Sequence, residues 1–207
     1  MSRATLAIIL SKLKPFPAPK TSLEQYPTPS EAAATILWDA HTKGLITSKH
    51  VLDLGAGTGI LGIGAMALGA KKVTFIDIDE SLRTIIEANI ATMKREANTS
   101  TGEYDIRVQD ITATTTTADL VISNPPFGTK EKHTDTNFLE KAYQLAPECY
   151  TFHKSSTDAY LRQWFNQQQI RIIQPFPFTF SLPSTMQHHE KRAHHVAITC
   201  WHTRKDL

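Results

Sequence analysis

The sequence VLDLGAGTG, at residues 51–59, decides the fold that we expect for this chain. Its first four residues are mostly apolar, alternating glycines follow at once, and residues 60–65 continue as an apolar segment. This order is typical of a buried strand, a tight loop and a helix, because glycines let the backbone turn sharply and approach a ligand closely. Gly57, Gly59 and Gly62 also fit the spacing G-x-G-x-x-G, so the loop alone leaves dinucleotide binding open.

Three further apolar segments follow along the chain, with helical or polar stretches between them. Each apolar segment has a polar residue at or just after its end. The expected strands are residues 73–79, 104–109 and 119–122, with Asp77, Asp110 and Asn124 as their terminal polar residues. The alternation predicts an α/β fold: a doubly wound, mostly parallel seven-stranded sheet of the Rossmann-like kind. Ligands bind such sheets at the carboxyl ends of the strands, so these residues predict a nucleoside site along one edge.

The remaining segments fit the same sheet. Asp79 is expected to cap a helix over residues 81–96. We expect further helices over 138–146 and 157–168, a fifth strand over 149–152, and a final antiparallel pair over 170–176 and 196–201. The polar loop at 183–195 contains several histidines, but their spacing matches no standard zinc ligand set, so no metal site is predicted.

The first 22 residues are expected to form an N-terminal helix and connector, and residues 23–207 a single domain. Residues 1–13 have the pattern of an amphipathic helix interrupted by charges, and they match neither a signal peptide nor a membrane span. Thr28 and Pro29 have the spacing of a helix cap followed by the first helical residue. Spacing alone therefore predicts that Thr28 caps the next helix.

The composition is that of a globular protein, with 41% hydrophobic residues in 207. The formal net charge of +2 is too small to predict nucleic-acid binding by itself. Cys149 and Cys200 lie far apart in apolar surroundings and are expected to be buried thiols. Their pattern favours a reducing compartment, and we expect a soluble, cytoplasmic protein.

The hexapeptide SNPPFG at residues 123–128 carries the chemistry that we predict. Consecutive prolines stiffen the backbone, and the side-chain carbonyl of Asn124 and the main-chain carbonyl of Pro125 offer two acceptors side by side. Phe127 supplies a flat face on which a base can stack. Together these features suit the binding of a planar amine by its NH₂ group, although a rigid turn after a strand would look the same.

Two motifs together resemble a known class of enzyme. Asp53, two residues before the first glycine of the loop, together with Asn-Pro-Pro-Phe after the fourth strand, is similar to class I methyltransferases that use S-adenosylmethionine on amino groups. Within that class, LEQYPT at 23–28, NPPFGTK at 124–130 and HKSS at 153–156 resemble the methyltransferase-like protein 5 family. That family is an S-adenosylmethionine-dependent RNA (adenine-N6-)methyltransferase family, acting on one adenosine of small-subunit ribosomal RNA to give N6-methyladenosine.

The resemblance, which covers residues 23–201, implies roles for the matching positions. The implied cofactor-binding residues are Gln25, Thr28, Asp53, Gly55, Gly57, Thr58, Gly59, Ile60, Asp77, Asp110, Ile111 and Asn124. Of these, Asp77 would hold the ribose hydroxyls, and Asp110 with Ile111 the adenine. The implied catalytic residues are Asn124, Pro125, Pro126 and Phe127. The chain departs from the animal members at Ala56 and Thr58, where those have cysteines.

The expected RNA contacts are basic side chains spread along the chain. They are Lys12, Lys14, Lys130, Lys132, Lys154, Lys191 and Arg192, which we expect to bind phosphate groups mainly.

The family also implies a heterodimer with a small zinc-binding activator protein. If the strand order follows the methyltransferase pattern, the strand at 104–109 lies at an edge of the sheet. Edge strands expose unpaired N–H and C=O groups, and this one contains no proline. The activator could add a strand there.

Other functions stay open on sequence alone. Guanine amino groups in RNA and protein glutamine are also served by Asn-Pro-Pro-aromatic motifs, although Phe127 leans away from the glutamine enzymes. The glycine loop allows a nicotinamide-binding oxidoreductase, but no acid–base pair for hydride chemistry stands out. A non-catalytic RNA-binding module is a further alternative, against which the intact motif argues.

Overall fold

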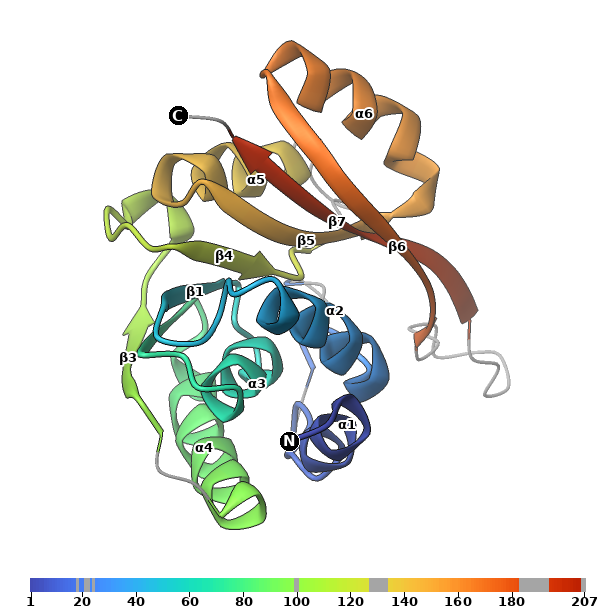
Figure 1. Ribbon diagram of the computed structural model, residues 1–207. Coiled ribbons are helices and arrows are strands. Elements are labelled where there is room, and N and C mark those ends of the chain that lie inside the picture. Colours follow the sequence, from blue (N-terminus) through green and yellow to red (C-terminus); the bar gives the residue numbers. More distant parts are fainter. Residues whose placement is uncertain are drawn as a thin grey trace.

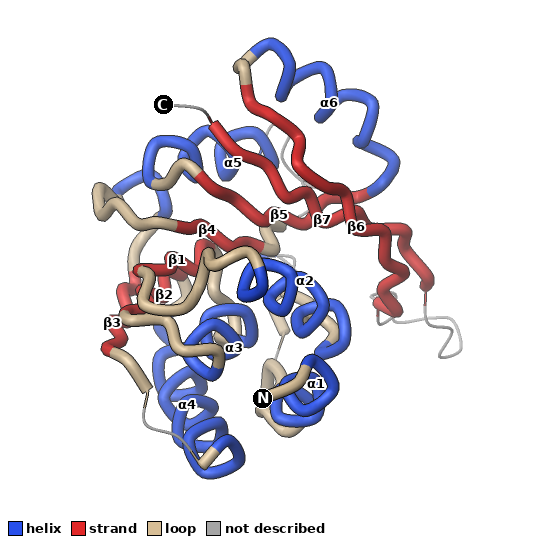
Figure 2. Tube along the Cα trace, in the orientation of Figure 1, coloured by secondary structure: helices blue, strands red, loops and turns tan. Residues whose placement is uncertain are grey.

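The computed structural model describes residues 1–17, 19–20, 23, 25–98, 101–126, 134–182 and 194–205, with the backbone alone at 134–136, 182 and 194. In this part of the chain, strands form one twisted central sheet with helices on both of its faces (Figures 1 and 2). The strands are β1 His50–Leu54, β2 Lys72–Asp77, β3 Glu103–Val108, β4 Leu120–Ser123, β5 Glu148–Lys154, β6 Ile170–Leu182 and β7 His194–Lys205.

The sheet has the order β3-β2-β1-β4-β5-β7-β6. Strands β1 to β5 pair in parallel, and β7 runs antiparallel between β5 and β6. The predicted seven-stranded, doubly wound sheet is therefore confirmed, as is the predicted edge position of β3. Strand β4 is buried along its whole length, because helices cover both faces of a parallel sheet and its strands are continuous apolar runs.

Six α-helices surround the described sheet. They are α1 Arg3–Ser11, α2 Ser30–Thr42, α3 Ile60–Ala67, α4 Arg83–Ala97, α5 Thr134–Leu145 and α6 Asp158–Gln167. Helices α1 to α4 pack on one face of the sheet, and α5 and α6 pack on the other (Figure 1). Each face has its own apolar core, so the sheet separates two hydrophobic layers.

The N-terminal helix is part of the first of these cores. Leu6 and Leu10 of α1 are almost fully buried and belong to the cluster that also contains Leu37 of α2 and Ile63 of α3. Helix α3 lies very close to the sheet: a Cβ atom at Gly62 would stand 2.3 Å from the ring of Phe75. The third glycine of the G-x-G-x-x-G spacing is therefore needed for helix-to-sheet packing.

Asp79 caps a helix as predicted. Its carboxylate accepts a hydrogen bond from the backbone N–H of Ser81, at the start of the short 3₁₀ helix η2 (Glu80–Leu82) that leads into α4. The thiols Cys149 and Cys200 are both buried and free, as expected.

The prediction that Thr28 caps the next helix is wrong. Helix α2 begins at Ser30, its N-cap residue is Pro29, and no side chain caps it. Thr28 lies one residue further out, and its hydroxyl oxygen accepts a hydrogen bond from Asn124 instead. The Thr28 hydroxyl therefore bonds the side chain of Asn124, which follows β4, and not the backbone N–H groups at the start of α2.

The C-terminal hairpin is longer than predicted. Strand β6 has 13 residues and β7 has 12, where the sequence pattern predicted strands over 170–176 and 196–201. Pro175 and Pro177 hid the continuation of β6. They are tolerated because β6 is an edge strand, where a missing N–H need not break a ladder.

Candidate active site

A cavity of about 570 Å³ opens at the carboxyl ends of β1, β2 and β4. Its described lining is Phe16, Leu23, Gln25, Tyr26, Pro27, Thr28, Asp53, Gly55, Ala56, Gly57, Thr58, Ile60, Leu61, Asp77, Ile78, Gln109, Asp110, Ile111, Asn124, Pro126 and Phe138. The structure thus brings together every residue predicted to bind the cofactor except Gly59. The volume is within the range of ordinary small-molecule sites.

The glycine loop turns at the mouth of β1. The N–H groups of Gly55 and Ala56 both donate to the carbonyl of Ile76, at 2.9 and 3.0 Å. Gly55, Gly57 and Gly59 have φ values of 69°, 56° and 84°, a left-handed conformation that favours glycine. A Cβ at Gly59 would meet Ile63 at 3.1 Å. Gly59 is therefore needed for the tight turn into α3, although it does not line the cavity.

Asp53 lies beneath the loop. It is 1% exposed, and its Oδ2 accepts a hydrogen bond from the N–H of Gly62 at 2.7 Å. Burial raises the pKa of Asp53 to about 8; the Gly62 bond opposes the rise, and the neighbouring charge of Asp77 adds to it. The carboxyl anchors α3 to β1, but its environment disfavours the charged form.

Asp53 therefore makes stability depend on pH. A carboxyl whose pKa rises from 3.8 to about 8 on folding binds more protons in the folded chain than in the unfolded chain between these values. Its contribution to stability falls as pH rises through this window. Asp53→Asn keeps an acceptor for Gly62 without the charge. We expect the melting temperature of the variant, relative to wild type, to rise by several degrees between about pH 5 and pH 8. A pH-independent difference in calorimetry would contradict this.

Asp77 is the second carboxylate of the cavity. Its Oδ2 accepts from the N–H of Gly57 at 2.7 Å, and its Oδ1 accepts from the N–H of Asp79 at 3.0 Å. Burial raises the pKa of Asp77, and the two backbone hydrogen bonds act in the opposite direction. Within the described part of the chain, neither Asp53 nor Asp77 forms an ion pair. Two such carboxylates favour a ligand that brings donors or positive charge.

Asp79 fastens the N-terminal segment beside the cavity. It is 5% exposed, and its carboxylate accepts hydrogen bonds from Lys20 Nζ at 2.7 Å and from Gln25 Nε2 at 2.8 Å. Burial favours a higher pKa for Asp79, but the bonds from Lys20, Ser81 and Gln25 outweigh burial and hold the pKa well below its ordinary value. Gln25, a predicted cofactor residue, thus lines the cavity while tied to Asp79.

The motif after β4 presents one unused acceptor. Asn124 Nδ2 donates to Thr28 Oγ1 at 2.9 Å, whereas Asn124 Oδ1 is buried and has no hydrogen-bond partner among the described residues. Tyr26 Oη donates to the carbonyl of Pro125 at 3.2 Å. Asn124 and Pro126 line the cavity. Phe127 lies outside the described residues.

Asp110 and Ile111 stand at the end of β3. The carboxylate of Asp110 accepts from the N–H and the hydroxyl of Thr112, and these bonds lower its pKa. Asp110 therefore caps the short 3₁₀ helix η3 (Ile111–Ala113) and lines the cavity at the same time. Ile111 is 8% exposed and adds an apolar wall.

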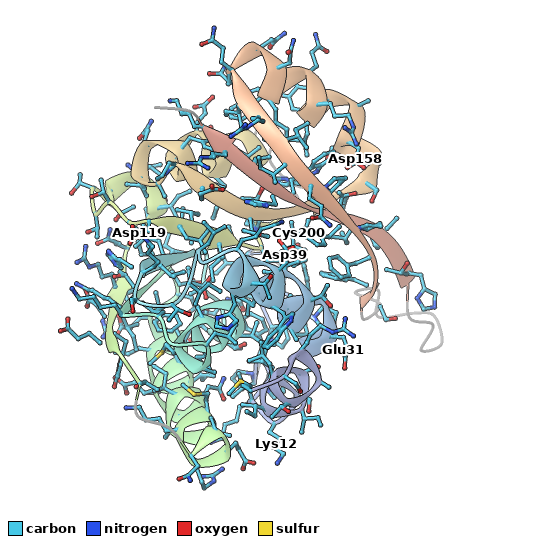
Figure 3. The ribbon with its side chains drawn as sticks, in the orientation of Figure 1. Lys12, Glu31, Asp39, Asp119, Asp158 and Cys200 are labelled. Atoms are coloured by element: carbon cyan, nitrogen blue, oxygen red, sulfur yellow. The ribbon has the colours of Figure 1, made fainter. Side chains whose placement is uncertain are left out.

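The predicted RNA-contacting residues are only partly described. Lys12, at the end of α1 (Figure 3), forms an ion pair with Glu96 at 2.5 Å. Lys14 has an exposed side chain, and Lys154 ends β5. Lys130, Lys132, Lys191 and Arg192 lie outside the described residues.

Sequence reasoning assigned no role to several lining residues. Phe16 lies against Gly57, where a Cβ would come within 2.9 Å of its ring. Ile78, just after β2, and Phe138 of α5 also reach the cavity. Leu23, Tyr26 and Pro27 carried a signal, because they stand within the segment LEQYPT, which resembles the family.

Two absences hold for the described residues. No helix among them is long and apolar enough to cross a membrane. Nor does any group of three or more His, Cys, Asp or Glu side chains there have the geometry to hold a metal ion.

Comparison with known proteins gives consistent matches. Residues 18–172 match the family model of conserved hypothetical protein 95. The rRNA N(6)-adenosine-methyltransferase METTL5 of Danio rerio is 31% identical over 96% of this chain and 96% of that protein. Protein MJ0284 of Methanocaldococcus jannaschii is 32% identical over 97% of this chain and 93% of its own. The crystal structure of PH1948 from Pyrococcus horikoshii has a TM-score of 0.89 and 32% identity, covering 100% of this chain and 99% of that one.

The sheet order and the cavity at its carboxyl edge define a class I methyltransferase, which uses S-adenosylmethionine as its methyl donor. Within this class, the chain belongs to the conserved hypothetical protein 95 family and to the methyltransferase-like protein 5 family.

The residues present fit the cofactor. S-adenosylmethionine brings a sulfonium cation, an ammonium group and two ribose hydroxyls. The cavity offers two carboxyl groups without a described cationic partner, those of the buried Asp53 and the half-buried Asp77. Ile78 and Ile111 supply apolar surface beside them. A cationic nucleoside therefore suits this site, because a positive charge nearby favours the ionised form of both carboxyl groups.

Proposed function

We propose that this chain methylates the N6 amino group of an adenosine in small-subunit ribosomal RNA. The observation that carries the proposal is the Oδ1 atom of Asn124, a buried acceptor without a partner among the described residues, beside the cavity. A buried polar atom normally has a hydrogen-bond partner, so this one, on a residue that lines the cavity, is suited to accept from a donor on the substrate. The relatives named as rRNA N6-adenosine methyltransferases support adenine as that substrate.

Methyl transfer to an adenine amino group requires that its weakly nucleophilic nitrogen be activated. Its lone pair is delocalised into the ring, which makes the nitrogen a poor nucleophile. Acceptors on its two hydrogens, Asn124 Oδ1 and the carbonyl of Pro125, would favour a pyramidal nitrogen and direct its lone pair toward the methyl donor. Pro125 already accepts one bond from Tyr26, and a carbonyl oxygen has a second lone pair for the substrate.

The bound cofactor supplies an electrophilic methyl group whose carbon–sulfur bond breaks as the new nitrogen–carbon bond forms, with the electron pair kept by sulfur. The chain itself positions the amine by Asn124 and Pro125, and the amine then releases one proton to water. No nucleophilic side chain is needed for this direct transfer.

Mass spectrometry of nucleosides tests the proposal. The full-length chain is incubated with S-adenosylmethionine and small-subunit ribosomal RNA, and the RNA is digested. N6-methyladenosine is the expected product. Methylation at N2 of guanine, methylation of a protein glutamine instead, or no transfer to small-subunit RNA would each overturn the assignment. The RNA from cells without the gene is expected to lack the same modified nucleoside.

We propose further that a small zinc-binding activator protein binds the edge strand β3. Glu103 donates its N–H group to the carbonyl of Lys71, just before β2, and Gln109 donates to the carbonyl of Asp77 at the end of β2. Alternation along the strand then directs the N–H groups of Tyr104, Ile106 and the residues in register with them away from the sheet. These outward groups are available to a strand of a partner.

A proline at position 106 tests this proposal. Ile106→Pro removes an outward N–H group and leaves the ladder to β2 in place, so association with the activator should be lost. Ile106→Val keeps the N–H group and should retain association. The measurement is co-purification of the two chains, with the melting temperature of each variant as the check on folding. A folded proline variant that still binds would exclude the β3 edge as the interface.

We also propose that the protein works in the cytoplasm. Cys149 and Cys200 are both free and buried, as is common in proteins of reducing compartments.

A further inference from the structure

The segment from Tyr26 to Thr28 contacts both of the acceptors on which the proposed chemistry depends. Thr28 Oγ1 accepts from Asn124 Nδ2 at 2.9 Å, and Tyr26 Oη donates to the carbonyl of Pro125 at 3.2 Å. These contacts span 96 and 99 residues of sequence. One N-terminal segment therefore supports two consecutive residues of the motif.

The contact from Thr28 holds the Asn124 amide with its NH₂ end toward Thr28. The carbonyl and NH₂ ends of an asparagine side chain have nearly the same shape, so packing alone does not distinguish them. Thr28 is 7% exposed, and its hydroxyl oxygen accepts from the NH₂ end. The carbonyl end is then the one left without a partner among the described residues. A reversed amide would turn a donor toward the donor of the substrate, and the two would repel.

The segment is itself held in place. Pro27 and Pro29 on either side of Thr28 restrict the backbone. Upstream, Gln25 donates to the buried carboxylate of Asp79 at 2.8 Å, and Lys20 pairs with the same carboxylate at 2.7 Å. Thr28 is thus part of a fixed support.

We propose that Thr28 and Tyr26 are positioning residues for methyl transfer: Thr28 orients the amide of Asn124, and Tyr26 holds the carbonyl of Pro125. This inference rests on the proposed function, because it assigns these side chains to the step in which the amino group is presented. It differs from the two roles that the sequence predicted for Thr28, a helix cap and a cofactor ligand. A cofactor ligand would affect binding of S-adenosylmethionine, whereas a positioning residue affects the transfer rate.

The kinetic test compares isosteric variants. Thr28→Val keeps the shape and removes the acceptor, and Thr28→Ser keeps the hydroxyl. Thr92→Val is the matched control, because the described hydrogen bond of the Thr92 hydroxyl is to the carbonyl of Ala88 in its own helix. Tyr26→Phe removes the donor to Pro125, and Tyr160→Phe, at an exposed position on α6, is its control.

The expected result separates rate from binding. In single-turnover assays with RNA, Thr28→Val should be about tenfold slower and Tyr26→Phe about threefold slower than wild type. Thr28→Ser and both controls should stay within about twofold. Calorimetric affinity for S-adenosylmethionine should change by less than about twofold in every variant. A loss of affinity that matches the loss of rate, or an unchanged rate in Thr28→Val, would overturn the proposal.

A second measurement does not depend on the RNA substrate. In protein labelled with ¹⁵N at asparagine, the side-chain amide signal of Asn124 is identified by its disappearance in Asn124→Ala. Its hydrogens should exchange with solvent about tenfold faster in Thr28→Val, with protection restored in Thr28→Ser. Unchanged exchange would overturn the role of Thr28. Failure of the wild-type protein to methylate RNA would instead reject the proposed function. The amide exchange rates would still show whether Thr28 holds the side chain of Asn124.

Discussion

Replacing Asn124 with alanine should lower the turnover of RNA methylation by about a hundredfold or more, while the affinity for S-adenosylmethionine changes little. The size follows from the loss of one preorganised polar contact to the reacting group. Asn124 Oδ1 is buried and has no described partner, so its removal breaks no hydrogen bond within the described protein. The only described bond lost is that from Nδ2 to Thr28.

Two further variants make this test sharper. Asn124→Asp keeps an acceptor toward the substrate, and the hydroxyl of Thr28 can rotate to donate to its second oxygen; it should be more active than Asn124→Ala. Asn166→Ala, at an exposed position on α6, is the control and should resemble wild type. Multiple-turnover assays measure the turnover of each variant, and a separate calorimetric titration measures its affinity for S-adenosylmethionine. Turnover of Asn124→Ala within about threefold of wild type would exclude the proposed role of this side chain.

The sheet could be predicted because its signals are local. The strands β1, β2 and β4 are short apolar runs, and each ends at a residue with an obvious chemical role, such as Asp77 or Asn124. Parallel strands bring their carboxyl ends to the same edge, so order along the chain was enough to predict that these residues meet. The edge position of β3 was predicted instead from the strand order of methyltransferases, which the family resemblance implied.

The contacts of the N-terminal segment could not be predicted in this way. Asn89, in the middle of α4, is fully buried and bonds both the N–H and the carbonyl of Lys14 as well as the carbonyl of Thr58. Asp79 and Thr28 likewise bond partners more than 50 residues away. For each of these polar residues the sequence predicted at most an ordinary local role, as a helix residue or a cap, and no periodicity marks its distant partner. The hydrogen-bond partners of these three residues depend on the tertiary fold and not on local sequence.

Replacing Asp77 with alanine should weaken S-adenosylmethionine binding by at least about tenfold and leave the fold intact. Its two carboxylate oxygens already accept from Gly57 and Asp79, at 2.7 and 3.0 Å, on the side of the loop. Each oxygen keeps a further lone pair for the ribose hydroxyls, and charge-assisted hydrogen bonds are about twice as strong as neutral ones. The variant loses these acceptors and also frees the N–H of Gly57.

The matched control is Asp119→Ala. Asp119 (labelled in Figure 3) also accepts a bond from a backbone N–H, that of His50 at 2.8 Å. It directly precedes β4, whereas the cavity lies at the carboxyl end of that strand. The Asp119→Ala variant should bind the cofactor with the affinity of wild type. The affinity of each protein is measured by calorimetry, and circular dichroism checks the fold. Equal affinity in Asp77→Ala and wild type would mean that the ribose does not bind at the end of β2.

The pH dependence of binding provides an independent test of the same carboxylate. Burial raises the pKa of Asp77, so protonation begins at a higher pH than for an exposed aspartate. The ionised form accepts from the ribose hydroxyls, so the wild-type affinity should fall as pH decreases through that raised pKa. Asp77→Ala lacks the group, and its disadvantage relative to wild type should shrink over the same range. If the ratio of the two affinities were constant with pH, the charge of Asp77 would not contribute to cofactor binding.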